Sequence, residues 1–200
     1  NQLKPDVIAV DSGGHFTNEV YAYTRDRRKY GVIAIKGASQ KDKPPIGKGK
    51  KLDLNWKGRI IKQGAELFTV GTDTIKTTLF SRLRHVESGA GYLHFNVKAD
   101  EEYFKQLTAE KQIIRFVKGF PVRDWVKKSS ARNEALDTLV YAYAGLHRLY
   151  QKKDRRTIWD NLEERGRIKG KLKENKGEKD YISELRSRKR VEKPKFVSSW

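Results

Sequence analysis

Three aspartates in this chain stand in settings that favour chemistry: Asp11, Asp73 and Asp137. Asp11 closes an apolar run at residues 7–10 and is followed by Ser12 and two glycines, which leave room for a close approach. A carboxylate at the end of a buried strand is costly to desolvate unless a cation or a donor meets it. Taken alone, Asp11 is equally well interpreted as a strand-end acid that caps a turn.

The other two aspartates are each associated with a predicted helix. Asp73 follows a predicted strand and precedes a helix, a place where aspartate is also a common helix cap. Asp137 lies in the second turn of a long predicted helix, where an uncompensated acid beside apolar neighbours destabilises the fold. Glu134 precedes Asp137 by three residues, so both carboxylates project from the same side of that helix. The helix macrodipole also favours an acid at Glu134.

Acids that converge in one cleft repel one another unless cations neutralise them. Two divalent ions would do so, and they would also activate water and stabilise the leaving oxygen in phosphodiester hydrolysis. The chain has no cysteine and four scattered histidines, which excludes thiolate metal sites. Carboxylate ligands then favour Mg²⁺ or Mn²⁺ over Zn²⁺. The acids therefore predict a site with two such ions.

The formal net charge of +19 predicts an anionic polymer as partner. Nucleic acid is the first choice, because each neutralised phosphate releases counterions. No stretch approaches the roughly 18 apolar residues of a membrane span, and no segment joins a strong apolar face to a basic one. We therefore expect no membrane partner.

A basic loop is predicted at residues 37–54, containing Lys48, Lys50 and Lys51. It lacks the GxxxxGK[ST] pattern of a phosphate-binding loop. We interpret it as a mobile loop that faces DNA, with a merely solvated excursion as the alternative. These three lysines, together with Lys76 and Arg132, are the expected DNA contacts.

The elements that must position the acids follow from hydrophobic periodicity. The first third predicts a meander of three strands, at residues 7–11, 17–24 and 31–36, with residues 24–29 as a hairpin connection. Further strands are predicted at residues 59–61, 66–71 and 92–97, and a hairpin at residues 112–117 and 122–126. Helices are predicted at residues 75–87, 100–107 and 131–150.

From residue 151 onward the chain becomes basic and poor in apolar residues. This tail is expected to be disordered or loosely helical, with residues 158–159 and 181–182 docking locally. We therefore predict one domain over residues 1–150 and a basic extension over residues 151–200. The chain starts at Asn1 and contains no methionine, so it is expected to be a piece of a longer polypeptide.

Three motifs together resemble the nuclease domain of the large terminase subunit of tailed phages, in its lambda-like branch. They are residues 10–15 (Val-Asp-Ser-Gly-Gly-His), residues 71–73 (Gly-Thr-Asp) leading into a helix, and residues 132–137 (Arg-Asn-Glu-Ala-Leu-Asp). The last hexapeptide is the most specific part, and Gly-Thr-Asp alone is weak. The resemblance covers about residues 5–150.

The resemblance implies an α/β, RNase H-like fold with a mixed central β-sheet flanked by helices. It implies a metal-dependent endonuclease that cuts double-stranded concatemeric viral DNA during genome packaging, in the cytoplasm of the infected bacterium. By matching motif, Asp11, Asp73 and Asp137 would be catalytic metal ligands, with Asp11 bridging both ions. Glu134 would be a substitute ligand or a supporting group.

The same resemblance implies partners: double-stranded DNA, an upstream ATPase domain of the same polypeptide, the small terminase subunit and the procapsid portal. Two alternatives stay open from the residues themselves. One is another RNase H-like DNA enzyme, such as a resolvase or a transposase. The other is a basic module that binds DNA without catalysis, which would need no convergent acids.

Overall fold

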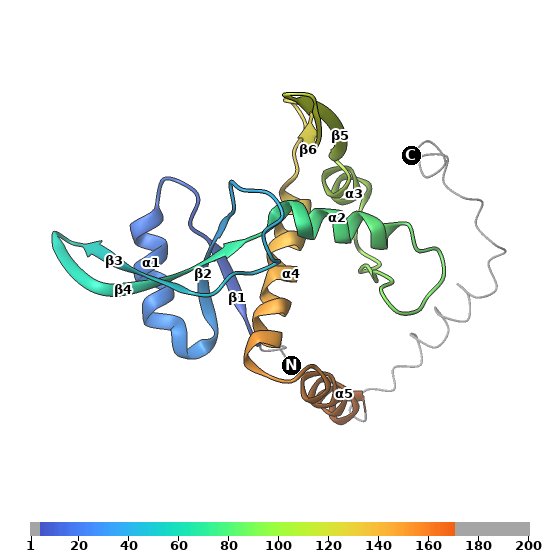
Figure 1. Ribbon diagram of the computed structural model, residues 1–200. Helices are drawn as coiled ribbons and strands as arrows, with labels where there is room; N and C mark the ends of the chain where they lie inside the picture. The colour runs from blue at the N-terminus through green and yellow to red at the C-terminus, as the bar shows by residue number, and fades with distance from the viewer. Residues whose placement is uncertain (1–4, 171–200) are drawn as a thin grey trace. The chain divides into compact units, whose positions relative to one another are not determined.

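The computed structural model describes residues 5–170. The chain divides into two units after Lys152 (Figure 1). Every strand found among residues 5–170 lies in the first unit, and the described part of the second unit contains helix α5 (Arg155–Gly170). The predicted tail therefore starts with a helix, while the residues at 181–182 lie outside the described part. No helix among the described residues has the length and apolar character needed to cross a membrane.

A four-stranded mixed sheet forms the centre of the first unit, in the order β1–β2–β4–β3 (Figure 1). β1, β2 and β4 are parallel, whereas β3 is antiparallel to β4. The strands are β1 (Ile8–Asp11), β2 (Val32–Gly37), β3 (Lys50–Trp56) and β4 (Arg59–Val70). Because parallel strands end at the same edge, Asp11, Gly37 and the end of β4 meet there. The structure is thus mixed α/β, as predicted.

The predicted strand at residues 17–24 is wrong, because these residues form most of helix α1 (Thr17–Arg27). The predicted hairpin connection at residues 24–29 is the end of α1 and a short 3₁₀ helix, η1 (Arg28–Tyr30). The meander is wrong too, since β1 and β2 are parallel and α1 is the crossover that parallel strands need. The prediction relied on the β-propensity of these residues. In the structure Tyr21 and Thr24, three residues apart, are both buried, and this is the spacing of one face of a helix.

Strands β3 and β4 form a hairpin that the sequence only partly predicts. The two short strands expected at residues 59–61 and 66–71 are one strand, β4, and β3 begins inside the predicted loop. The apparent break is a bulge: Gln63 has a φ of 50°, and its backbone N–H donates to Asp53 Oδ1 at 2.8 Å. A bulge interrupts the alternation of side chains without ending the strand.

The second half of the unit contains three helices and a separate hairpin. The helices are α2 (Thr72–Leu83), α3 (Glu101–Leu107) and α4 (Glu134–Lys152). The hairpin pairs β5 (Glu110–Val117) with β6 (Phe120–Lys127), which confirms the predicted one. The helices are confirmed with shifted ends, and Asp137 lies in the first turn of α4 rather than the second. The strand predicted at residues 92–97 is wrong: the segment has no regular structure, and Phe95 packs on Phe104 instead of pairing with a strand.

Helices cover both faces of the sheet. On one face, Ile33 and Ile35 of β2 pack with residues of α2 and α4. On the other face, Ala34 packs with Tyr21 of α1. Leu136, Val140 and Ala144 of α4 are buried at intervals of four residues, which is helical spacing, and burial of a side chain as large as Leu or Val contributes about 1.5–3 kcal/mol. This packing holds the first turns of α2 and α4, which carry Asp73 and Asp137, on the core side of the sheet.

Candidate functional site

Asp11 ends β1 at the shared carboxyl edge of the parallel strands. Its Oδ1 accepts the backbone N–H of Gly13 at 2.9 Å, and its Oδ2 accepts the Tyr141 hydroxyl at 3.3 Å. The residue is solvent-exposed. A Cβ on Gly13 would lie 3.2 Å from Asp11 Oδ1, so the glycine lets the loop turn close beside the carboxylate. The side chain is oriented by two donors and remains open to solvent.

Asp137 lies near Asp11 and is half-exposed. Burial raises the pKa of Asp137 above its ordinary value; the ammonium of Lys76 lowers it, and the carboxylates of Glu110, Asp11 and Glu134 raise it further. Lys76 Nζ lies 3.9 Å from Asp137 Oδ1, at the limit of an ion pair. The raised pKa means that this one ammonium does not offset burial and the neighbouring negative charges.

Tyr141, in the second turn of α4, donates a hydrogen bond to Asp11 and lies near the charge of Asp137. Burial raises its pKa to about 12, and the charges of Asp11 and Asp137 together with the hydrogen bond to Asp11 act in the same direction. The phenol therefore keeps its proton at neutral pH. Tyr141 acts as a donor that orients the Asp11 carboxylate.

Asp73 lies in the first turn of α2 and does not cap the helix with its side chain. Its Oδ2 accepts the backbone N–H of Asp42 at 2.8 Å, and the neighbouring Thr74 hydroxyl donates to Lys43 O at 2.7 Å. Gly71 N–H donates to Pro44 O at 3.1 Å. The basic loop between β2 and β3 is therefore fastened to the start of α2, and Asp73 is one of its attachment points.

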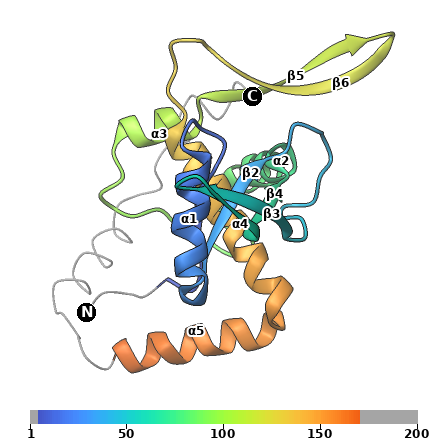
Figure 2. The same ribbon diagram turned by 90° about the vertical axis from the view of Figure 1, so that its left-hand side faces the viewer.

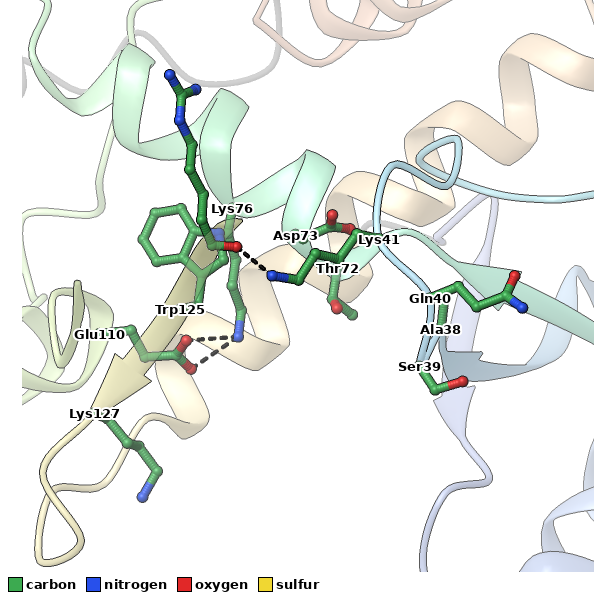
Figure 3. A pocket seen from close by; sticks show the side chains of 11 residues that line it. Ala38, Ser39, Gln40, Lys41, Thr72, Asp73, Lys76, Glu110, Trp125 and Lys127 are labelled. Carbon is green, nitrogen blue, oxygen red and sulfur yellow. Dashed lines mark hydrogen bonds and ion pairs between the residues drawn. The ribbon is translucent and has the colours of Figure 1, made fainter. Parts of the chain in front are cut away.

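An open pocket of about 370 Å³ lies beside Asp73 (Figure 3). Asp73, Lys76 and Glu110 line it together with Arg123, Trp125 and Lys127 of β6. Figure 3 shows Lys76 and Glu110 facing each other across two hydrogen bonds. The pocket thus places acids from α2 and β5 beside cations from the β5–β6 hairpin.

Glu110 is a site residue that sequence reasoning missed. It is buried, with its side chain 7% exposed, and both of its oxygens accept from Lys76 Nζ at 2.8 Å. The Asn133 amide donates to Glu110 Oε1 at 2.8 Å and to Asp137 Oδ2 at 3.1 Å. In the sequence Glu110 is a single acid between a predicted helix and a predicted strand, and nothing in that pattern predicts that its side chain is buried. Only the tertiary structure shows that Asn133 links this acid to Asp137.

Glu134 and Arg132 pair with each other at the surface. Arg132 Nε lies 3.3 Å from both oxygens of Glu134, and both side chains are mostly exposed. The pKa of Glu134 is lowered, first by a hydrogen bond from its own backbone N–H and then by Arg132 and Lys127. The expected metal group Glu134 and the expected DNA contact Arg132 therefore form an ion pair with each other.

The predicted DNA contacts divide into two settings. Lys48, Lys50 and Lys51 are exposed, Lys48 in the loop and the others at the start of β3. Lys76 instead has only 13% of its side chain exposed and lies between Glu110 and Asp137. The structure therefore places Lys76 inside the acidic site, whereas the other three lysines face solvent.

Residues 5–170 contain no group of three acidic or histidine side chains close enough to form a complete metal site. Asp11 is the last residue of β1, and Asp73 lies in α2 just after β4. These two strands lie on either side of β2, and two strand spacings amount to about 10 Å. Gly37, at the end of β2, lies between them: a Cβ there would come within 3.3 Å of Thr72 and 4.0 Å of the Tyr141 hydroxyl. The three predicted ligands therefore share one edge of the sheet, with Asp11 close to Asp137 and Asp73 set apart.

Comparison with known proteins identifies the family. Residues 1–158 match the family model described as the terminase large subunit gpA, endonuclease domain. The large terminase subunit of Escherichia phage lambda is 35% identical over 146 residues, which is 70% of this chain and 21% of that protein. The large terminase subunit of Enterobacteria phage P21 is 34% identical over 148 residues, 70% of this chain and 22% of that protein. No solved structure matches the chain.

The chain spans about a fifth of the length of these curated relatives. The family match covers most of the chain and includes Asp11, Asp73, Asp137 and the buried Glu110. This span also contains the whole sheet, the β5–β6 hairpin and α4. The chain therefore belongs to the endonuclease domain family of the phage terminase large subunit.

Proposed function

We propose that this domain cuts double-stranded concatemeric viral DNA during genome packaging by two-metal-ion phosphodiester hydrolysis. The observation that carries the proposal is the proximity of the Asp11 and Asp137 carboxylates at the carboxyl edge of the sheet, in a chain of net charge +19. Burial and nearby carboxylates raise the pKa of Asp137 despite Lys76. Such a site favours an added cation, and the basic surface around it favours a polyanionic substrate.

The donor set fits Mg²⁺ or Mn²⁺, because it consists of carboxylate oxygens with no thiolate or imidazole among them. Asp11, Asp73 and Asp137 would hold the ions. Bound ions would supply a nucleophilic water and stabilise negative charge on the phosphate. Glu134, which pairs with Arg132, is a supporting group in this proposal.

The chain's own residues prepare this site in three ways. The Tyr141 hydroxyl orients Asp11, and the Asn133 amide holds Glu110 and Asp137 in fixed relation. Lys76 neutralises the buried Glu110, so that this acid is tolerated beside the others. The exposed lysines of the β2–β3 loop and the start of β3 would bind the DNA backbone.

The finer features of the assignment rest on the family resemblance. We propose an RNase H-like relationship for the fold, although its first two strands are parallel rather than part of the expected meander. We also propose that the domain acts in the infected cell's cytoplasm, beside an upstream ATPase domain, the small terminase subunit and the procapsid portal. By the same resemblance, the extension over residues 151–200 would lie where the family contacts the procapsid portal.

A cleavage assay tests the proposal. Supercoiled plasmid is incubated with the wild-type domain, with Asp11→Asn and with Asp137→Asn in Mg²⁺ and in Mn²⁺. We expect the wild type to nick and linearise the plasmid and both variants to lose at least a hundredfold in rate, because each lacks a ligand. Asp26→Asn, an exposed acid of α1, is the matched control and keeps full activity.

The same preparation distinguishes the alternatives. A resolvase would cut four-way junctions in preference to linear duplex, so both substrates are included. A DNA-binding module without catalysis would bind plasmid and leave it intact. It would also show no rise in melting temperature with Mn²⁺, whereas a true metal site stabilises the fold by mass action.

A further inference from the structure

One face of the β5–β6 hairpin continues directly from the acidic site to the hairpin tip. Residues directly opposite each other in an antiparallel ladder share a face. The face that begins with Glu110 is therefore formed by four pairs, Glu110 with Lys127, Gln112 with Trp125, Ile114 with Arg123, and Phe116 with Pro121. We call this set the site face of the hairpin. Its inner end lines the pocket beside Asp73.

The outer half of the site face exposes large apolar side chains. Ile114 is 61% exposed and Phe116 is 74% exposed. The opposite face ends in Val117 and Phe120, with Phe120 73% exposed. A Lys118–Gly119 turn with φ values of 52° and 82° joins the strands at the tip. Apolar side chains clustered on a projecting, charged element are typical of a contact surface.

The hairpin has an excess of positive charge. Residues 110–127 contain five Lys or Arg and two acids, and both acids are paired with cations from outside the hairpin: Glu110 with Lys76, and Asp124 with Lys41. Arg123 lies on the site face directly opposite Ile114, where it also lines the pocket, and its side chain is exposed. Arg123 and Lys127 thus share the site face with the exposed Ile114 and Phe116, while Lys111 and Arg115 lie on the opposite face.

The base of the hairpin is fixed to the body of the domain. Trp125 packs on Phe80 of α2 with ring centroids 4.7 Å apart. Lys41, from the β2–β3 loop, donates to Asp124 and to the backbone oxygen of Arg123. Figure 2 shows the hairpin extending away from the four-stranded sheet. A ribbon held at its base and free at its tip keeps a constant direction relative to the acidic site.

We propose that the site face of the β5–β6 hairpin is an arm that lies in a groove of duplex DNA, with Arg123 on the phosphates and Phe116 against the groove. A two-stranded ribbon fits the major groove of B-DNA, and apolar wedges at the tips of DNA-binding elements contact base steps. Charge selects DNA over a protein partner, because the apolar residues stand among cations rather than in a neutral patch. The inference rests on the proposed nuclease function, since it takes the acidic site to be where DNA is cut.

The geometry sets where the arm contacts DNA. Phe116 is six residues beyond Glu110 on β5, which corresponds to about 20 Å of extended strand. Because base pairs are about 3.4 Å apart, the tip would contact DNA about six base pairs to one side of the cut. This contact is sequence-tolerant if it is made mainly to phosphates and sugars.

Two phenylalanines at the tip provide a matched comparison. Phe116 and Phe120 are the same residue type with nearly equal exposure, but they lie on opposite faces of the ribbon. Duplex DNA binding is measured by fluorescence anisotropy in Ca²⁺ or EDTA, with hydroxyl-radical footprinting alongside. We expect Phe116→Ala to weaken binding about tenfold and to lose protection about six base pairs from the cut. Phe120→Ala should change binding less than twofold.

Arg123→Gln should weaken DNA binding and reduce the magnitude of the negative slope of log K against log salt by about 1. Equal binding by the wild type and Phe116→Ala, or equal losses for the two phenylalanine variants, would overturn the proposal. Self-association of the wild type that Phe116→Ala abolishes would overturn it as well, by assigning the face to a protein contact. Failure of the nuclease proposal is distinguishable, because the wild type would then bind DNA without cutting it.

Discussion

At the scale of single residues, the acidic site is defined by charges that are only partly compensated. Lys76 is the single cation within ion-pair distance of Glu110 and Asp137 among the described residues. The pairing with Glu110 is close and buried, whereas the approach to Asp137 is at the limit. Removing the charge of Asp137 should therefore stabilise the metal-free protein, whereas removing the charge of Lys76 should destabilise it.

Asp137→Asn should raise the stability of the metal-free domain at neutral pH. A carboxyl whose pKa is raised in the folded state costs stability above that pKa, and this cost disappears as the pH falls toward the unfolded value of about 4. Thermal unfolding in EDTA should thus show a gain over wild type at pH 7 that shrinks on acidification. A lower melting temperature for Asp137→Asn at pH 7 would contradict this account.

Lys76→Ala should destabilise the domain by about 3 kcal/mol, because it leaves the buried Glu110 carboxylate without its cation. Urea unfolding at pH 7 measures the effect. Adding Glu110→Gln to this variant should recover a large part of the loss. Lys105→Ala is the control, since Lys105 pairs with Glu101 at the surface and its removal should change little.

At the scale of elements, the attachment of the β2–β3 loop to the start of α2 positions Asp73. Gly71 is the critical residue, because a Cβ there would lie 2.1 Å from Lys43 O and 2.6 Å from Pro44 O. These two carbonyls belong to the backbone and do not move aside as a flexible side chain would. The loop and α2 can therefore stay in contact only if this position has no side chain.

Gly71→Ala should destabilise the domain by about 2 kcal/mol or more, through displacement of the loop backbone. Hydrogen exchange should show faster exchange at Asp42, whose N–H is held by Asp73. Gly89→Ala is the matched control, because a Cβ at Gly89 meets no atom within 4 Å. Similar destabilisation by the two substitutions would show that the loop contact does not matter.

At the scale of the whole molecule, we expect the net charge of +19 to dominate the affinity for DNA. Lys48, Lys50 and Lys51 are exposed, at or near the start of β3. Each of the three is taken to contact one phosphate, so changing all three to Gln should reduce the magnitude of the negative slope of log K against log salt by about 2.7. DNA binding is measured in EDTA over a range of salt concentrations.

A control for this variant removes three cations from the opposite edge of the sheet. Arg25, Arg27 and Lys29 lie at the end of α1 and in η1, just before β2 begins, so they are remote from Asp11 at the other end of the strands. Their combined replacement by Gln should change the slope much less. Equal changes in slope for the two triple variants would mean that DNA does not bind preferentially at the edge of the sheet that carries Asp11.

The sequence alone was sufficient for the features that depend on local chemistry. The strand ending at Asp11, the helices α2, α3 and α4 and the β5–β6 hairpin follow from hydrophobic periodicity and turn residues. The family resemblance also came from short motifs, and the comparisons confirm it. These signals lie within a few consecutive residues, where spacing and residue type are informative.

Only the tertiary structure decided the features that depend on distant contacts. Residues 17–24 have the local propensity of a strand, but packing on the sheet makes them a helix and turns the meander into a parallel pair. Nothing near Glu110 in the sequence indicates that it is buried against Lys76 and tied to Asp137 by Asn133. Strand order likewise puts β2 between Asp11 and Asp73. The physical reason is the same throughout: burial and charge pairing depend on which elements meet in space, and adjacent residues carry no record of that.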